Sequence, residues 1–456
     1  MARLDATVAA QREEIARKDG FIVFQQERID KLEAALEESR RRSKRQAAPF
    51  SKGDPKRDPK TPGRKSGDGH GRHGHRRVPA GRPDREMTAV LPGCCPDCGG
   101  QIVHERDAEQ WQTEVPEVRP TVTRFIVQIG RCKGCKRRVQ GRHPEQTSQA
   151  LGAAGVGVGP RLKAWAAWLH YGMGLSFARS AKVLSYLGVD VTAGAICASS
   201  ARSACTDLVP VHRELVARAN RSKTITMDES GWRVGGHGAW LWVAANDEIT
   251  LCWIADGRSF DDATTIIDAG YTGVLVRDGW IVYDRYTQAA HQSCTAHILR
   301  RATEMEADMT GADRKIPTAA KRIIKDALAA RNLADPADRV AAAAAATARL
   351  ERLCARPAGN DANRRLLKHL AHQAPYLFTF LTVEGVPATN WQGEQAVRPC
   401  VVNRKTFGGN RTTVGARTQG VITSIIATAT KNHRDVIGYL TGLARAPDSG
   451  LATLLT

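Results

Sequence analysis

The sequence has no long apolar run, and this absence excludes an integral membrane protein. A membrane-spanning helix needs about 20 consecutive apolar residues, and no stretch of the 456-residue chain is that long and that apolar. The N-terminus lacks the apolar segment of a secretory signal, so we expect a cytoplasmic protein. The 11 cysteines are an odd number and mostly scattered, which argues for reduced thiols and against a disulfide framework.

Acidic residues are scarce relative to basic ones. The chain has 67 Lys and Arg against 47 Asp and Glu, which gives a formal net charge of +20. Such a charge calls for an anionic partner, and nucleic acid is the first candidate. Hydrophobic residues make up 42% of the chain, enough for two or three domains with a substantial core.

The first 90 residues are predicted to form a helix followed by a linker. Apolar residues recur at heptad spacing from Val8 to Leu36, which predicts a coiled-coil helix over 1–40. A helix packed on its own domain is the alternative. Residues 41–90 are rich in Lys, Arg, Gly and Pro and nearly free of apolar residues, so they are predicted to be a disordered basic linker that contacts phosphates.

Two C-x-x-C pairs predict a zinc-binding domain over 91–145. Each pair can form a turn that presents two sulfurs to one ion, and four thiolates complete a tetrahedral site for one structural Zn²⁺. The predicted ligands are Cys95, Cys98, Cys132 and Cys135, and strand-like sequence at 121–131 lies between the pairs. Cys94 is an alternative to Cys95, although Cys95 gives the better spacing. A redox dithiol would need only one pair.

Beyond residue 150 the pattern is helical, then strand-like, then helical again. Residues 155–220 have the rhythm helix, Gly turn, helix, with Thr192 as a helix cap, which resembles a helix-turn-helix. An ordinary helical hairpin is the alternative. The segments "TITMDESGWRV", "AWLWVAANDEITLCWIADGRS" and "GVLVRDGW" are predicted strands. Residues 312–385 have helical spacing and no strand pattern.

Two of the predicted strands carry aspartates at or near their ends, Asp228 and Asp278. If these strands are neighbours, the two carboxylates share one edge of the sheet. Glu394, from a predicted helix, is the best third acid for a site that holds two Mg²⁺ or Mn²⁺ ions and catalyses phosphoryl transfer. Asp228 would contact both ions. Singly, each acid also fits a strand-end, turn or helix-surface role, and the competitor Glu229 points to the opposite face of its strand.

Four stretches together resemble the DDE transposases of the insertion-sequence-66 family: "MDESGWRV", "VLVRDGW", "CTAHILRR" and "NWQGEQAVRPCVVNRKTFGGNRT". The order of segments is similar too, from the N-terminal helix to about residue 440. The resemblance implies an α/β catalytic core of RNase H-like type over 221–440. It further implies an all-helical insertion at 305–385, and a C-terminal tail would occupy 441–456.

The resemblance also implies which residues carry the chemistry. The family's two aspartates and its glutamate fall on Asp228, Asp278 and Glu394. Its Cys-x-x-His-x-x-Arg-Arg pattern begins at Cys294. Thr389 departs from the Asp-Asn-Asn run that usually precedes the glutamate. The expected DNA-contacting residues are His297, Arg300, Arg301, Arg398, Arg404, Lys405 and Arg411.

The implied function is cleavage of element-end DNA followed by strand transfer into target DNA. Double-stranded DNA would be the partner, the chain would form a homo-oligomer in a prokaryotic nucleoid, and helper proteins of the same element are possible partners. His297 has two alternative readings, a buried structural histidine or a second zinc site with Cys294. For the whole protein, the alternatives are a non-catalytic DNA-binding regulator and an inactive transposase remnant.

Overall fold

A computed structural model describes residues 76–445, together with Lys18 and Gln25. The predicted coiled coil at 1–40 and most of the basic linker therefore lie outside the described residues, apart from those two positions. The chain divides into two compact units, one ending at Glu117 and one beginning at Val118, and each is described by itself. None of the described helices is long and apolar enough to cross a membrane.

The described residues on either side of the boundary at Glu117 and Val118 contain few helices or strands. Residues 76–117 contain turns but no helix or strand. In the second unit, β1 (Ile129–Arg131) and β2 (Arg138–Gln140) form a short antiparallel hairpin. The strand expected over 121–131 is therefore confined to its last three residues. Residues 121–128 have no strand partner, and their apolar side chains Val122 and Ile126 are 89% and 82% exposed, so no core holds them in a sheet.

The helices predicted over 155–220 are confirmed. They are η1 (Gly152–Gly155), α2 (Pro160–Ala167), the π-turn η2 (Trp168–Gly172), α3 (Phe177–Tyr186), α4 (Ala193–Cys205) and α5 (Val209–Asn220). Thr192 caps α4, as predicted, because its hydroxyl accepts a hydrogen bond from the Ala195 backbone NH. Leu184 of α3 and Ile196 of α4 pack in one small core, so the two helices and their Gly188 turn form a single unit.

Two buried histidines make this helical region sensitive to acid. His170 stacks on Phe177, with ring centroids 3.7 Å apart, and burial lowers the pKa of His170 to about 4. Burial lowers the pKa of His212 to about 4 as well, and Arg417 contributes. Since an unfolded histidine titrates near 6.5, the unfolded chain binds more protons between about pH 6.5 and pH 4, and stability falls as the pH falls through that range.

Each histidine is protonated in the unfolded chain but neutral in the folded chain at pH 5. We therefore expect each one to lower the free energy of unfolding by about 2 kcal/mol between pH 7.5 and pH 5. Urea unfolding at the two pH values measures this change. A His170→Asn variant should show a smaller difference between pH 7.5 and pH 5 than the wild-type chain. An equal difference in both proteins would mean that His170 is not held neutral in the folded state.

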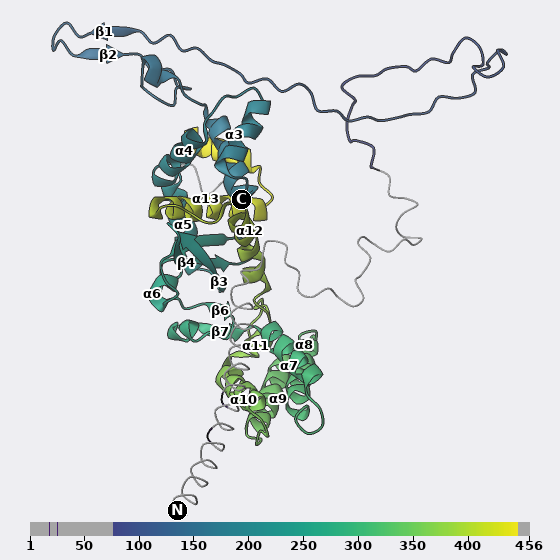
Figure 1. Ribbon diagram of the computed structural model, residues 1–456, viewed down its shortest axis with the longest axis vertical. Coiled ribbons are helices and arrows are strands. Elements are labelled where there is room, and N and C mark those ends of the chain that lie inside the picture. Colours follow the sequence, from purple (N-terminus) through teal and green to yellow (C-terminus); the bar gives the residue numbers. More distant parts are fainter. Residues whose placement is uncertain (1–17, 19–24, 26–75, 446–456) are drawn as a thin grey trace, which may run out of the picture. The chain divides into compact units, whose positions relative to one another are not determined.

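The central sheet has five strands in the order β5-β4-β3-β6-β7 (Figure 1). Their bounds are β3 (Thr224–Val234), β4 (His237–Ala245), β5 (Thr250–Ala255), β6 (Val274–Arg277) and β7 (Ala290–Ser293). The first three in sequence form an antiparallel meander, and β6 and β7 run parallel to β3. The short elements α6 (Phe260–Ala263) and η3 (Ile281–Arg285) lie in the connections.

Alternate residues of the strands face two separate cores. Met227, Trp242 and Leu275 belong to the larger core, which also contains residues of the helical region. Leu241 and Val243 face the other way and pack with Val397. The helix of Val397, α12 (Trp391–Phe407), therefore covers the second face of the sheet.

Helix α13 (Thr413–Lys431) packs along β5, the strand at one edge of the sheet. The Thr428 hydroxyl accepts from the Thr250 NH and donates to the Thr250 carbonyl, each at 3.1 Å. One helical turn earlier, Ser424 makes the same pair of contacts with Cys252, at 2.8 Å and 3.3 Å. Side-chain hydroxyls thus satisfy the unpaired backbone groups that an edge strand would otherwise present to another chain.

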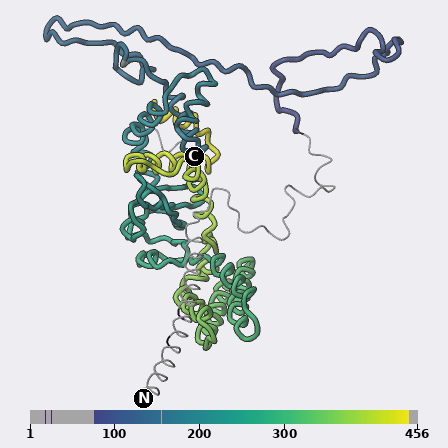
Figure 2. Tube along the Cα trace, viewed as in Figure 1, coloured from purple at the N-terminus to yellow at the C-terminus, as the bar shows by residue number. Residues whose placement is uncertain are grey.

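The predicted all-helical block is confirmed, with somewhat different limits. It contains α7 (Thr295–Asp308), α8 (Lys315–Ala330), α9 (Pro336–Cys354), α10 (Asp361–Gln373), η4 (Ala374–Tyr376) and α11 (Thr379–Thr382). The expected start at 305 falls inside α7, which begins directly after β7. Figure 2 follows the chain through this block and back along α12. Within the described residues the final helix is α14 (Val436–Arg445), and it extends into the expected tail because Leu440 and Leu443 are buried in the larger core.

Candidate active site

Asp228 and Asp278 lie level with each other on neighbouring strands. The parallel strands β3 and β6 pair Thr224 with Val274 and continue in step to Thr226 and Val276. Each aspartate follows the last of these pairs by two positions, so both share the face of the sheet that Thr226 and Val276 occupy. The alternation that predicted buried strands therefore also places the two carboxylates at one edge.

Glu394 reaches the same edge from the first turn of α12. The preceding residue, Gly393, is buried against β3. A Cβ atom at this position would lie 3.1 Å from the Asp228 Cβ and 3.1 Å from the Thr226 Cγ2. The helix thus begins directly over the first aspartate. Asp278 and Glu394 both lie near enough to Asp228 for their charges to raise its pKa, so the three acids approach one another from β3, from the end of β6 and from α12.

The electrostatics of Asp228 favour a bound cation. Burial, the largest cause, and repulsion from Glu229, Asp278 and Glu394 together raise the pKa of Asp228 to about 7. The hydrogen bond that Asp228 Oδ1 accepts from the Glu229 NH, 2.9 Å long, only partly opposes this effect. Carboxylates gathered in this way favour a divalent cation, and their hard oxygen atoms suit Mg²⁺ or Mn²⁺.

The start of α12 is held by Asn390, a residue whose role the sequence did not reveal. Asn390 is fully buried, and its side-chain amide donates to the Met227 carbonyl of β3 at 3.1 Å. Its backbone NH donates to the Cys294 sulfur at 3.2 Å. An asparagine before a helix normally suggests a cap, but here the side chain bonds across to the sheet and fixes the position of Glu394.

Replacing Gly393 by Ala is expected to lower the unfolding free energy by about 1–3 kcal/mol. The added Cβ would lie 2.6 Å from the Asn390 Oδ1 as well as against Asp228, so α12 has to move away from β3. Urea unfolding measures the effect. The matched control is Gly442→Ala in α14, where nothing lies within 4 Å of the new Cβ. Similar stability of the two variants would contradict this packing.

Arg277, directly before the second aspartate, is completely buried. Its guanidinium donates to the Asp278 carbonyl at 2.9 Å, to Asp284 Oδ1 at 2.9 Å, and to Gln373 of α10. Burial lowers the pKa of Arg277, and the Asp284 charge opposes that effect. The arginine therefore ties the end of β6 both to the loop after it and to the helical block.

Glu229 lies on the other face of β3, as strand alternation requires. Its carboxylate accepts hydrogen bonds from Arg258 and from the Tyr283 hydroxyl. The Arg258 guanidinium in turn lies over the Trp280 ring, 3.7 Å from the centroid. The Trp280 backbone NH donates to Asp278 Oδ1 at 2.9 Å. The contacts among Glu229, Arg258 and Trp280 therefore help to hold the second aspartate in place.

His297 lies between Cys294 and Glu394. Its Nε2 is 3.7 Å from Glu394 Oε1. One ligand atom from each of Cys294, His297 and Glu394 lies within 4.8 Å of the other two. Among the described residues the three acids do not form such a group by the same measure, so in this arrangement Glu394 is turned toward His297. His297 was predicted to contact a DNA phosphate, but in the structure its neighbours are Cys294 and Glu394.

The Cys294–His297 pair is electrostatically coupled. Burial would raise the pKa of the Cys294 thiol, but the neighbouring His297 ring and the hydrogen bond from the Asn390 NH outweigh burial and lower that pKa. The Cys294 thiol raises the pKa of His297, and burial opposes it. These directions favour a thiolate beside the ring, which is the form of cysteine that binds metals.

The other predicted DNA contacts lie in α7, in α12 and in the turn that follows α12. Arg300, Arg398, Lys405 and Arg411 are exposed, whereas Arg301 and Arg404 are half-buried. Arg404 lies over the Trp232 ring of β3, 5.9 Å from its centroid. The turn after α12 is pinned to the end of β3, because Gly409 has a φ of +105° and a Cβ there would lie 2.5 Å from the Arg233 carbonyl oxygen.

The two cysteine pairs have the same local geometry. The Gly99 NH donates to the Cys95 carbonyl, and the Cys95 NH donates to the Gly100 carbonyl. Around Cys132 the same two bonds recur with Lys136 and Arg137, and Lys136 takes a positive φ as Gly99 does. Backbone NH groups lower the pKa of Cys95 and of Cys132. Each pair is thus a turn that holds two sulfurs side by side.

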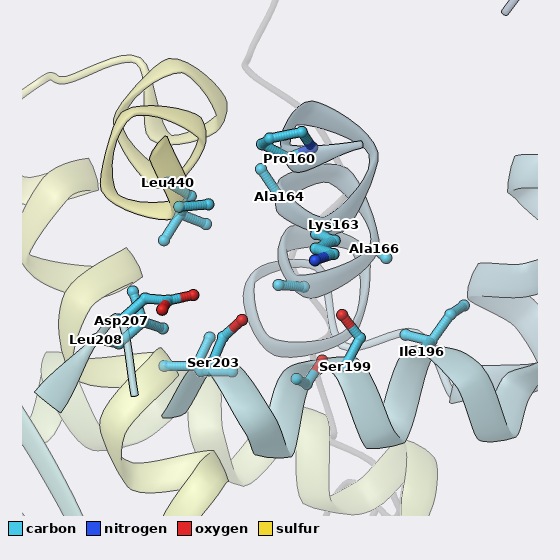
Figure 3. A pocket seen from close by; sticks show the side chains of 14 residues that line it. Pro160, Lys163, Ala164, Ala166, Ile196, Ser199, Ser203, Asp207, Leu208 and Leu440 are labelled. Carbon is cyan, nitrogen blue, oxygen red and sulfur yellow. The ribbon is translucent and has the colours of Figure 1, made fainter. Parts of the chain in front are cut away.

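The pocket between α2, α4 and α14 is a separate feature (Figure 3). Its lining is mostly small or apolar, with Lys163, Ser199, Ser200, Ser203 and Asp207 as polar members. None of the acids at the sheet edge belongs to it, and the serines and the aspartate have no histidine beside them in the lining. This pocket therefore lies apart from the candidate chemistry.

Comparison with known proteins supplies a family. The family model described as "Transposase IS66 family" matches residues 155–418, which include the helical region, the sheet, the helical block and all of α12 with the start of α13. A search of curated proteins gives no match. The matched segment contains every one of the three acids.

Proposed function

The chain belongs to the IS66 family of transposases, and from this membership we propose that it cleaves DNA at the ends of a mobile element and joins those ends to target DNA. The observation that carries the proposal is that Asp278 and Glu394 approach Asp228 closely enough for both charges to raise its pKa. The strand order β5-β4-β3-β6-β7, with β6 and β7 parallel to β3, supports an RNase H-like core.

We propose that the three acids hold divalent cations, Mg²⁺ or Mn²⁺, of which Asp228 would contact two. The donor set fits, because three carboxylates gather and their mutual repulsion helps to raise the pKa of Asp228 to about 7. When bound, the ions supply activation of the attacking hydroxyl and stabilisation of the leaving oxygen. Asn390 and Arg277 position the acids. The exposed Arg398, Lys405 and Arg411 contact DNA phosphates.

The remaining segments are assigned by the same reasoning. We propose that Cys95, Cys98, Cys132 and Cys135 hold one structural Zn²⁺, because the two turns match each other and present lowered thiol pKa values. The pair α3–α4 is proposed to bind DNA, and pairing of two element ends calls for a homo-oligomer acting in the cytoplasm. Helper proteins of the same element are further proposed partners.

The test is a cleavage assay on labelled duplexes that carry the ends of the element encoding this chain. We expect strand breakage at the element boundary in Mg²⁺ or Mn²⁺ and none in a chelator. We also expect binding to weaken steeply as salt rises, since phosphate contacts release counterions. Tight binding without breakage in either metal would favour the second candidate, a DNA-binding regulator or an inactive remnant.

A further inference from the structure

We propose that Cys294, His297 and Glu394 form a second metal site, which binds a thiophilic divalent cation such as Zn²⁺ and takes Glu394 away from the magnesium site. The three ligand atoms lie within 4.8 Å of one another and come from the start of α7 and the start of α12. A ligand set of one sulfur, one nitrogen and one carboxylate oxygen suits zinc, whereas magnesium prefers oxygen ligands alone.

The spacing is close to that of a bound ion. Zinc bonds of about 2.0–2.3 Å in a tetrahedron place ligand atoms about 3.3–3.8 Å apart. The His297 Nε2 to Glu394 Oε1 distance is already 3.7 Å. Small rotations of exposed parts of the His297 and Glu394 side chains, which are 40% and 37% exposed, would complete the site and leave a fourth position open to water.

The surroundings are also those of a metal site. The Cys294 sulfur accepts a hydrogen bond from the Asn390 NH at 3.2 Å, the kind of outer contact that orients a thiolate ligand. The Nδ1 atom of His297 is buried and has no hydrogen-bond partner among the described residues. A buried ring nitrogen without a partner is unfavourable, and a ring rotation that makes Nδ1 the ligand in place of Nε2 would relieve it.

The functional consequence comes from Glu394, which cannot serve both metals. In this structure the Glu394 Oε1 lies 3.7 Å from the His297 Nε2, and the three acids do not form a ligand group among the described residues. Zinc at this site would therefore inhibit cleavage by removing the third magnesium ligand. This part rests on the proposed function, whereas metal binding itself does not.

Co²⁺ titration of the full chain, followed by thiolate-to-cobalt charge-transfer absorption, tests the binding. We expect Cys294→Ser to bind about one equivalent fewer than the wild-type chain. The matched control Cys354→Ser, which removes a half-buried thiol in α9, should bind the same number as wild type. The cysteine turns are present in all three proteins, so their contribution cancels. Equal stoichiometry in Cys294→Ser and wild type would overturn the proposal.

Two further variants separate a ligand from a merely structural residue. Both His297→Ala and Glu394→Gln are expected to weaken the Cys294-dependent Co²⁺ site by at least about tenfold. Circular dichroism checks that each variant is folded. If Cys294→Ser loses the site but Glu394→Gln keeps its affinity, Glu394 is not a ligand and the shared-carboxylate idea is overturned.

Inhibition is measured separately, as the ratio of cleavage with and without added Zn²⁺ at fixed Mg²⁺. We expect added Zn²⁺ to lower the cleavage rate at least about tenfold in wild type and in Cys354→Ser. In Cys294→Ser the two rates should be nearly equal. A chain that binds Co²⁺ through Cys294 but cleaves no DNA would refute the proposed function and leave the metal site standing. Equal zinc inhibition of all three proteins would refute the inhibitory role.

Discussion

Replacing Asp278 by Asn is expected to lower metal-dependent DNA cleavage by at least about a thousandfold while the chain stays folded. The substitution keeps the shape of the side chain, and the amide oxygen still accepts the hydrogen bond from the Trp280 NH. It removes the negative charge at the edge where Asp228 and Glu394 gather. The measurement is the rate of strand breakage on element-end DNA in Mg²⁺.

Asp338→Asn is the matched control for this experiment. Asp338 is an exposed acid in the first turn of α9, remote in sequence from the three acids, and its loss removes the same charge from the protein. We expect the control to cleave at nearly the wild-type rate. Cleavage by Asp278→Asn at a rate similar to that of the control would show that the charge at the sheet edge is not needed for the reaction.

The second large effect is expected for stability. Arg277→Met should lower the unfolding free energy by about 3–5 kcal/mol, because removal of one partner leaves the others of a buried charged network unpaired. Asp284 is only 20% exposed and would keep only its contact with His372 after losing Arg277, and Gln373 would lose its hydrogen bond from the guanidinium. Urea unfolding measures the difference from wild type.

The control for Arg277→Met is Arg349→Met. Arg349 pairs with Asp326 at 2.8 Å, but the two side chains are 37% and 49% exposed. Solvent screens such a pair, so its loss should cost less than about 1 kcal/mol. If the two variants were equally stable, the junction between β6 and the helical block would not depend on the buried guanidinium.

Local patterns in the sequence predicted much of the fold. Alternating residues around Met227 and Leu275 indicated buried strands, and Thr192 indicated a helix start, because both signals depend on near neighbours in the chain. The strand expected at 121–131 was wrong over most of its length. A strand needs a partner and a core to cover it, and neither is encoded within the segment itself.

The arrangement of the site was only partly predictable. The three acids were predicted from their chemistry and from the resemblance to a family. Three features of the site depend on contacts between residues more than 90 positions apart in the chain. They are the hydrogen bonds of the buried Arg277, the close packing at Gly393, and the hydrogen bond from Asn390 to β3. The nearness of Glu394 to Cys294 and His297 depends in the same way on how α12 returns to the start of α7.

The most direct test of the central claim is anomalous diffraction from crystals of the chain soaked in Mn²⁺. The account predicts manganese peaks at the sheet edge, in contact with both Asp228 and Asp278, with Glu394 completing the coordination. Crystals of Asp278→Asn should lose at least one of these peaks. The absence of manganese from Asp228 and Asp278 in well-diffracting wild-type crystals would contradict the claim that these acids are the metal-binding centre of a transposase.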